Sequence, residues 1–393
     1  MVITPFNFTR TPKILFGAGR FSEVGKIAGE IGETVLIVTG SRSLKSSEKW
    51  DELVKSLQTA SLRHFEISAT GEPSPEFVDS AVTKFKDRGI DVVLAVGGGS
   101  VLDAGKAISA MLLQDKSVVN FLEGVGTGEA HNGVKIPFVA VPTTSGTGSE
   151  VTKNAVLSKT GPDGYKKSLR HDNFVPDVAL IDPELMVSCP NEITASTGID
   201  ACTQLLEAYV STKATPLTDA IAISGLEQIR INLVLACTTG ADDVNVRAGM
   251  AYAAFASGIV LANAGLGIVH GLASPLGGHF PIPHGVACGT LVSSATKENI
   301  DTMRESNLDN PTLSKYAHAG WLLSKKHSNN IYEGCDILIE QLDEWTEKLN
   351  LPLLTEYGIS VSDLDQIIEE TGQKNNPVNL SYERIKNILS RRM

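Results

Sequence analysis

The first half of the chain alternates short apolar segments with amphipathic ones. Helical patterns such as EKWDELVKSLQTA and EFVDSAVTKFKDRG separate the apolar segments. Strands that alternate with helices are typical of a parallel sheet covered on both faces, so we expect a Rossmann-like α/β domain. The predicted strands are residues 34–40, 62–68, 91–99, 137–144 and 177–183.

The strand signals end after Pro190, where long helical patterns such as TDAIAISGLEQIRINLVLAC and EGCDILIEQLDEWTEKLN follow. A chain of 393 residues is long enough for two domains. We therefore predict an α/β domain over residues 1–188 and an all-α domain over residues 189–393.

One uncharged stretch, residues 249–269, is long enough to cross a bilayer. Because Gly258, Asn263 and two further glycines interrupt it, we interpret it as a buried core helix. The N-terminal residues lack the basic region and apolar core of a signal peptide.

Charge and cysteine content narrow the function classes. A net charge of -11 argues against nucleic acid or an anionic membrane surface as a partner, because both require a basic face. The odd number and wide scatter of the cysteines, without a CxxC pair, predict neither a disulfide framework nor a thiolate zinc site and favour a reducing cytoplasm. These cysteines are Cys189, Cys202, Cys237, Cys288 and Cys335.

Two loops at predicted strand ends have the composition of a phosphate-binding site. DVVLAV is followed directly by GGGS and a helical segment, and glycines there allow phosphate oxygens to approach the backbone at a helix start. PFVAV is followed by a loop rich in Thr, Ser and Gly at a second strand end. A tight turn without a ligand explains one such loop, but two together indicate a dinucleotide. The expected contacts are Gly97, Gly98, Gly99, Ser100, Thr143, Thr144 and Thr147.

The end of the first predicted strand bears on cofactor choice. An acidic residue at such a position binds the ribose 2′-hydroxyl and repels a 2′-phosphate, but here the chain has Gly40, Ser41 and Arg42. The guanidinium can grip a phosphate, so the pattern favours NADP(H) over NAD(H). A polar turn with a solvated arginine is the other interpretation.

Four polar residues form a candidate metal site. Asp200 and Gln204 are four residues apart in a helical pattern, so their side chains share one face, and His270 and His284 add two imidazoles. A carboxylate, an amide oxygen and two imidazoles suit a divalent ion such as Zn²⁺ or Fe²⁺. Individually each is more often a solvated charge or a loop histidine, but residues 262–284 contain no Lys, Arg, Asp or Glu, which indicates burial.

The motifs together resemble the iron-containing (group III) alcohol dehydrogenase family. FGAG, GGGSVLDAGKAI, VPTTSGTGSEVT, PDVALIDPEL, VHGLASPLGG and PHGVACG occur in the family's order over nearly the whole chain. The resemblance implies an N-terminal nucleotide-binding domain, a C-terminal helical domain and a metal in the cleft between them. The implied fold is similar to dehydroquinate synthase and glycerol dehydrogenase.

The resemblance also assigns roles. It places metal ligands at Asp200, His270 and His284, and the second ligand, usually His in the family, at Gln204. The family often has a further His, a proton shuttle, where this chain has Ser274. Lys166 matches a lysine that the family often directs into the site, and the nicotinamide is expected near Ser100, Asp103, Thr143 and Thr144.

We therefore expect an NAD(P)-dependent alcohol dehydrogenase or aldehyde reductase that acts on a small molecule. From the cysteine content we expect a cytoplasmic protein, and we also expect a homo-oligomer, a dimer. Two alternatives stay open: a dehydroquinate-synthase-like or glycerol-dehydrogenase-like enzyme of the same fold, and a metal-free relative that acts as a binding protein. The first alternative expects extra cationic residues for a phosphorylated substrate.

Overall fold

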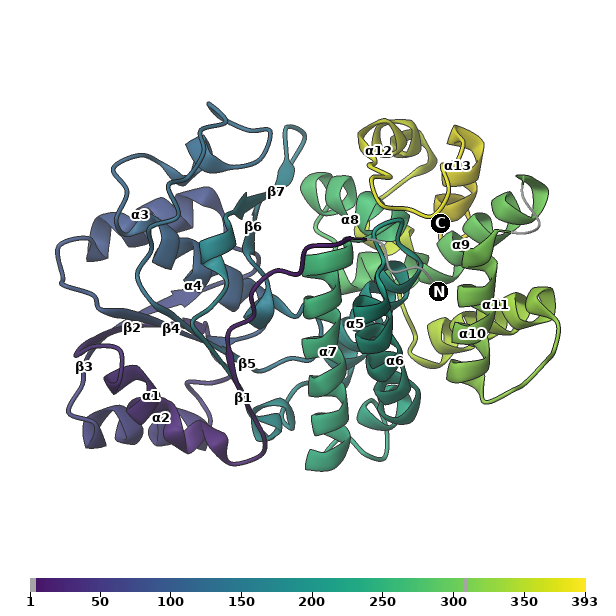
Figure 1. Ribbon diagram of the computed structural model, residues 1–393. Coiled ribbons are helices and arrows are strands. Elements are labelled where there is room, and N and C mark those ends of the chain that lie inside the picture. Colours follow the sequence, from purple (N-terminus) through teal and green to yellow (C-terminus); the bar gives the residue numbers. More distant parts are fainter. Residues whose placement is uncertain (1–4, 307–309) are drawn as a thin grey trace. The chain divides into compact units, whose positions relative to one another are not determined.

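The computed structural model describes residues 5–306 and 310–393 (Figure 1). They form two compact units. The α/β unit comprises Thr9–Lys159 and Lys166–Cys189. The helical unit comprises Pro190–Met393 together with residues 5–8 and Thr160–Tyr165. The sequence-based boundary after residue 188 lies beside the start of the main helical segment, whereas the two short segments had been assigned to the first domain.

A six-stranded parallel sheet forms the centre of the α/β unit, in the order β1-β8-β5-β4-β2-β3. The five predicted strands are present as β2, β3, β4, β5 and β8. The edge strand β1 has only four residues, KILF, and was not predicted. The strands are β1 (Lys13–Phe16), β2 (Thr34–Gly40), β3 (Arg63–Ala69), β4 (Val92–Gly97), β5 (Phe138–Pro142) and β8 (Val178–Ile181).

Helices cover both faces of this sheet, as its nearly continuous apolar strands require. Val35 and Ile37 of β2 share a core with Leu53 and Leu57 of α2. On the opposite face α4 packs against β4 closely enough that a Cβ at Gly105 would lie 2.7 Å from Ala95. The helices are α1 (Val24–Gly29), α2 (Glu48–Thr59), α3 (Pro75–Phe85) and α4 (Gly99–Met111), and a separate strand pair, not predicted, consists of β6 (Asn154–Lys159) and β7 (Tyr165–Arg170).

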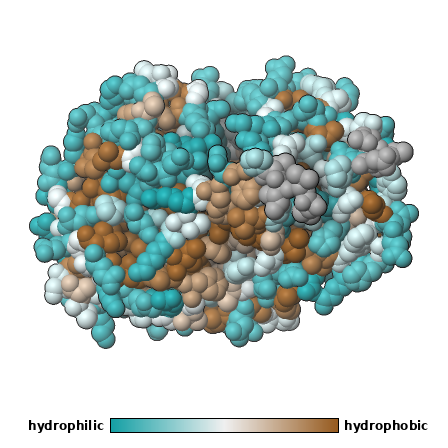
Figure 2. All heavy atoms as spheres, viewed as in Figure 1, coloured by the Kyte–Doolittle hydropathy of each residue, from teal (hydrophilic) through white to brown (hydrophobic). Residues whose placement is uncertain are grey.

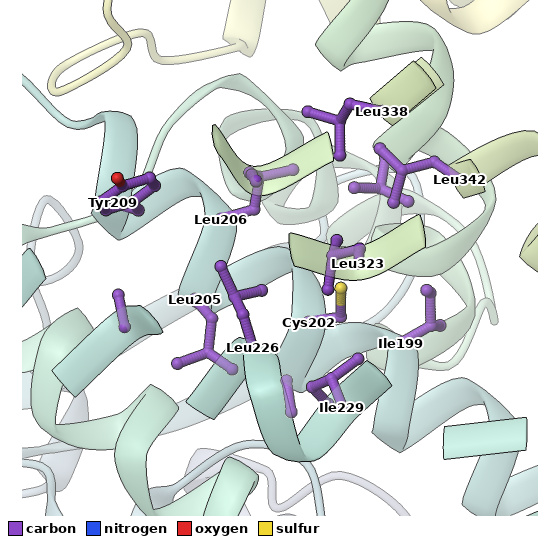
Figure 3. Packing of buried hydrophobic residues seen from close by; sticks show 14 of the residues in the cluster. Ile199, Cys202, Leu205, Leu206, Tyr209, Leu226, Ile229, Leu323, Leu338 and Leu342 are labelled. Atoms are coloured by element: carbon purple, nitrogen blue, oxygen red, sulfur yellow. The ribbon is translucent and has the colours of Figure 1, made fainter. Parts of the chain in front are cut away.

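The second unit is helical, as expected from the loss of strand signals. Its largest apolar core joins α5, α6, α10 and α11, and Figure 3 shows Ile199, Cys202 and Leu205 of α5 in that core. The helices are α5 (Asn191–Val210), α6 (Pro216–Ala236), α7 (Val244–Ala264), α8 (Ile268–His279), α9 (His284–Ser306), α10 (Pro311–Ser324), α11 (Ile331–Lys348), α12 (Leu364–Glu370) and α13 (Tyr382–Ser390).

Helix α7 contains most of the uncharged stretch singled out in the sequence. Among the described residues it is the one helix long and apolar enough to cross a membrane, and 61% of its apolar window is buried within the protein. Its packing against α5 and α6 accounts for that burial. On the face shown in Figure 2, hydrophilic residues cover much of the surface, with hydrophobic patches between them.

Candidate functional site

The sheet order creates a switch point between β2 and β4. The chain proceeds from β2 outward to β3 and then returns to place β4 on the other side of β2, with Thr39 paired with Val96. Ligands of open parallel sheets bind outside the carboxyl ends of the strands at such a point. Gly40 ends β2 and is followed by Ser41 and Arg42, and Gly97 ends β4 and is followed by residues 98–100, so the fold brings these predicted contacts to one edge.

The predicted loop after β5 lies beside the predicted loop after β4. Pro142 pairs with Gly97, and the backbone N–H of Thr143 donates to the carbonyl of Gly97 over 3.0 Å. A Cβ at Gly98 would lie 3.3 Å from the Thr144 side chain. A Cβ at the next glycine, Gly99, would lie 2.7 Å from Thr147. The glycines therefore permit a close fit between the two loops.

Helix α4 begins at this edge without a side-chain cap. Its N-cap residue is Gly98, in an extended conformation, and the helix starts at Gly99. The first N–H groups of a helix lack intrahelical acceptors and carry a partial positive charge. The start of α4 is therefore a suitable place for a phosphate.

Asp103, one turn into α4, is bound to the protein itself. One carboxylate oxygen accepts from the Ser149 hydroxyl over 2.5 Å and the other accepts from the Val156 N–H over 3.1 Å. Burial raises the pKa of Asp103, and the charge of Lys106 opposes this rise. These two hydrogen bonds hold the segment after β5 against α4. The expected position of Asp103 near the nicotinamide stays a prediction.

The segment after β2 is open. Ser41 and Arg42 are exposed, and a Cβ at Gly40 would meet only Val101, at 3.9 Å. The guanidinium is thus available at the strand end where the sequence predicts a ribose phosphate.

In the helical unit, three predicted ligands from three helices converge. Asp200 of α5 lies with its Oδ1 3.3 Å from Nε2 of His270 in α8 and 4.0 Å from Nε2 of His284, the first residue of α9. Cys288 joins them: its Sγ lies 3.6 Å from the first imidazole and 3.8 Å from the second. The donor atoms of these four residues all lie within 4.8 Å of one another. We refer to Asp200, His270, His284 and Cys288 as the four-residue cluster.

Helix α5 presents the cluster because it is buried on two sides. Ile199, Cys202 and Leu205 enter the apolar core, whereas Asp200 and Gln204 share another face by their four-residue spacing. The sequence thus places a charged group inside the protein, where it requires partners.

Glu207, which the sequence interpretation missed, continues the polar face of α5. Its Oε2 lies 2.7 Å from Nδ1 of His270, and its Oε1 accepts from the Val269 N–H over 2.7 Å. Because a carboxylate only accepts, Nδ1 carries a proton, and Nε2 is the ring nitrogen that faces Asp200 and Cys288. A carboxylate behind an imidazole is a common support for metal-binding histidines. The spacing of three residues after Gln204 on one helix is the signal that identifies it.

Gln204 is adjacent to Asp200, but its amide is oriented by other contacts. Its Nε2 donates to Asp200 Oδ2 over 3.3 Å, and its Oε1 accepts from the Ser257 hydroxyl over 2.9 Å. The carboxylate selects the nitrogen end of the amide. The predicted ligand oxygen is therefore engaged by α7 in this structure.

The charges in the cluster influence one another. Burial would raise the pKa of Asp200, but the nearby imidazoles outweigh it and the pKa lies below its usual value. Burial would lower the pKa of His270, yet Cys288, Asp200 and Glu207 hold it well above its usual value. Burial raises the pKa of the Cys288 thiol to about 12.

These residues fit a divalent cation. Among the described residues, the buried Asp200 Oδ1 accepts no hydrogen bond, a costly arrangement for a carboxylate unless a cation completes it. One carboxylate and two imidazoles are a common donor set for Zn²⁺ and Fe²⁺. The His284 side chain is 27% exposed and the Asp200 side chain 1%, so solvent reaches the cluster from the α9 side.

The two other predicted catalytic residues lie outside the four-residue cluster. Ser274 is half-buried in α8, one turn after His270. Lys166 lies in β7, where its Nζ donates to Glu72 over 2.5 Å, and Glu72 also accepts from Ser158. This ion pair with Glu72 holds the lysine side chain, and the catalytic role of Lys166 stays a prediction.

Two family models match this chain, one over most of the α/β unit and one over most of the helical unit. The family described as iron-containing alcohol dehydrogenase matches residues 11–183, and its C-terminal part matches residues 194–393. The chain belongs to the iron-containing alcohol dehydrogenase family. It is an oxidoreductase of the NAD(P)-dependent alcohol dehydrogenase type, with the α/β and helical fold that the resemblance implied.

Individual known proteins are similar along nearly their full length. The NAD-dependent methanol dehydrogenase of Bacillus methanolicus is 30% identical and covers 98% of this chain and 98% of its own. The NADPH-dependent butanol dehydrogenase of Clostridium saccharobutylicum is 30% identical, with 97% and 96% covered. The solved structure of a 1,3-propanediol oxidoreductase has a TM-score of 0.89 at 28% identity and covers 99% of this chain and 100% of its own.

Proposed function

We propose that this iron-containing alcohol dehydrogenase interconverts a small alcohol and its aldehyde, with NADP(H) preferred over NAD(H) and with one Fe²⁺ or Zn²⁺ held by the helical unit. The convergence of Asp200, His270 and His284 around a buried carboxylate oxygen without a hydrogen bond carries this proposal. The substrate is expected to be a small, uncharged alcohol or aldehyde.

The metal would act as a Lewis acid toward the substrate oxygen. The protein supplies the orientation: Glu207 fixes the His270 ring, and Gln204 holds one oxygen of Asp200 so that the other faces the histidines. Ser274 and solvent are the proposed proton carriers to the substrate oxygen, since no imidazole occupies position 274. Lys166 is proposed as a further charge near the reacting groups.

The glycine loops support the proposed cofactor site. Gly97, Gly98 and Gly99, with the start of α4, provide backbone N–H groups for the pyrophosphate, and Ser100, Asp103, Thr143, Thr144 and Thr147 are the neighbouring contacts that we propose. Arg42, Ser41 and the space beside Gly40 support a 2′-phosphate.

A homodimer and a cytoplasmic location are further parts of the proposal. Among the described residues none of the five cysteines forms a disulfide, which suits a reducing compartment. Light scattering of the purified protein, without a tag, tests the dimer directly.

The decisive experiment is turnover, followed by nicotinamide absorbance, with a panel of small aldehydes and alcohols, NADPH or NADH, and protein whose metal content has been measured. Reduction that requires the metal and runs faster with NADPH supports the proposal. Turnover of the nicotinamide only within a lyase cycle indicates a dehydroquinate-synthase-like enzyme instead. Tight cofactor binding without metal or turnover indicates a binding protein.

A further inference from the structure

Cys288 has no part in the predicted ligand set, yet the structure places it in the four-residue cluster. It lies four residues after His284 on α9, so the two side chains share one helix face. The sulfur is fully buried beside both imidazoles.

The shorter separations within the cluster have the size that a shared ion requires, whereas Asp200 Oδ1 and His284 Nε2, 4.0 Å apart, would have to move closer together. With metal–nitrogen bonds of about 2.0 Å and metal–sulfur bonds of about 2.3 Å, tetrahedral angles place neighbouring ligand atoms about 3.3 to 3.6 Å apart. Asp200 Oδ1 and His270 Nε2 are 3.3 Å apart, and Cys288 Sγ is 3.6 and 3.8 Å from the two imidazoles.

The two carboxylate oxygens of Asp200 differ in their contacts. Oδ2 accepts from the Gln204 amide nitrogen, while the buried Oδ1 accepts no hydrogen bond among the described residues. The Gln204 oxygen meets Ser257. For Gln204 to become a ligand, its amide would have to rotate, which would abandon both contacts and turn an oxygen toward the carboxylate.

We propose that Cys288, as a thiolate, is the fourth protein ligand of the metal, in place of Gln204. The inference rests on the proposed metal site, and it changes the chemistry of that site. A thiolate is a softer donor than an imidazole or an amide oxygen, so the site should favour Zn²⁺ and Co²⁺ over Mn²⁺ more strongly than an Asp-His-His set with an oxygen donor.

Cobalt titration of the metal-depleted full-length protein, under anaerobic conditions, tests this ligand set. A Co²⁺–thiolate bond gives a near-ultraviolet charge-transfer band that oxygen and nitrogen ligands do not give, and metal analysis gives the stoichiometry independently. Wild-type protein is expected to bind one Co²⁺ and to show the band. Cys288→Ser, which keeps the size of the side chain, should lose the band and bind Zn²⁺ at least about 10-fold more weakly, with a smaller change for Mn²⁺.

Three further variants make the result specific. Cys288→Ala repeats the test without a hydroxyl, Cys202→Ala removes an equally buried thiol from the α5 core, and Gln204→Leu removes the amide. The last two should keep the band, and circular dichroism of each metal-free variant establishes folding. Stoichiometric cobalt binding without the band, or a band that survives in Cys288→Ser, overturns the inference but leaves the metal site in place. Failure of the wild-type protein to bind cobalt overturns both.

Discussion

The two candidate binding regions are built in opposite ways. At the carboxyl ends of β2 and β4 the site consists of space and backbone N–H groups, and glycine is essential because a Cβ at Gly99 would collide with Thr147. In the helical unit the site consists of side chains from α5, α8 and α9 whose backbones are regular. Adding a side chain should therefore damage the first region, and removing one should damage the second.

Removal of Asp200 is the strongest way to test the side-chain region. Asp200→Ala takes away the buried carboxylate on which both imidazoles converge, so bound metal should be lost. We expect turnover to fall on the order of 10³-fold, since Lewis-acid assistance contributes several kcal/mol. Metal analysis and steady-state kinetics measure both effects. Asp219→Asn, a carboxylate paired with Lys315 in the same unit, is the control and should keep its metal. Unchanged metal content and activity in Asp200→Ala would refute the assignment.

Addition of a methyl group tests the backbone region. In Gly99→Ala the new Cβ would lie 2.7 Å from the Thr147 side chain, so that side chain or its loop must shift. Overpacking of about 2 kcal/mol would raise the dissociation constants of NADPH and NADH alike by roughly 30-fold. Fluorescence titration of both cofactors measures this. Gly40→Ala, with only Val101 at 3.9 Å, is the matched control and should bind nearly as the wild type does. Unchanged dissociation constants in Gly99→Ala would show that these loops do not form the cofactor site.

A charge at Gly40 tests cofactor choice. Because the position has room for a side chain, Gly40→Asp should act through repulsion of the 2′-phosphate and through a new acceptor for the 2′-hydroxyl. We expect the ratio of kcat/KM values to shift toward NADH by about 10-fold or more, corresponding to about 1.4 kcal/mol. The neutral Gly40→Ala variant separates charge from size. Wild-type protein that prefers NADH at the outset would disprove the proposed preference.

The smallest effect concerns proton delivery. Without an imidazole at position 274, the pH profile of kcat should lack a titration near ~6.5, the ordinary pKa of histidine. Ser274→His should introduce one, provided that hydride transfer limits turnover. His279, which interacts with Glu370 over 2.9 Å, is the histidine to exclude. A wild-type titration that disappears in His279→Ala but persists in Ser274→Ala would assign the proton to His279.

The regular parts of the fold were accessible from the sequence because burial leaves periodic patterns. The five predicted strands and helices such as α2, α6 and α11 agree with prediction within a few residues. Strand β1 and the pair β6 and β7 lacked a signal, since a four-residue edge strand and half-exposed strands such as YKKSLR do not differ from loops in composition.

The helical site was partly accessible for the same reason. Spacing along α5 indicated Asp200 and Gln204, but the orientation of an amide depends on Ser257 from another helix. A search for cysteine pairs does not find Cys288, whose partners are histidines. The pattern that would have found it is the same four-residue spacing, applied from His284 along α9.

The double burial of α5 connects ion binding with the cohesion of the helical unit. One side of this helix is a wall of the apolar core, while the other gathers Asp200, Gln204 and Glu207. An ion that binds only the folded arrangement stabilises it by about 2.7 kcal/mol when free metal is 100-fold above its dissociation constant. Metal depletion would therefore loosen the helix that anchors the whole unit, so the ion supply of the cell would help to set the lifetime of the enzyme as well as its rate.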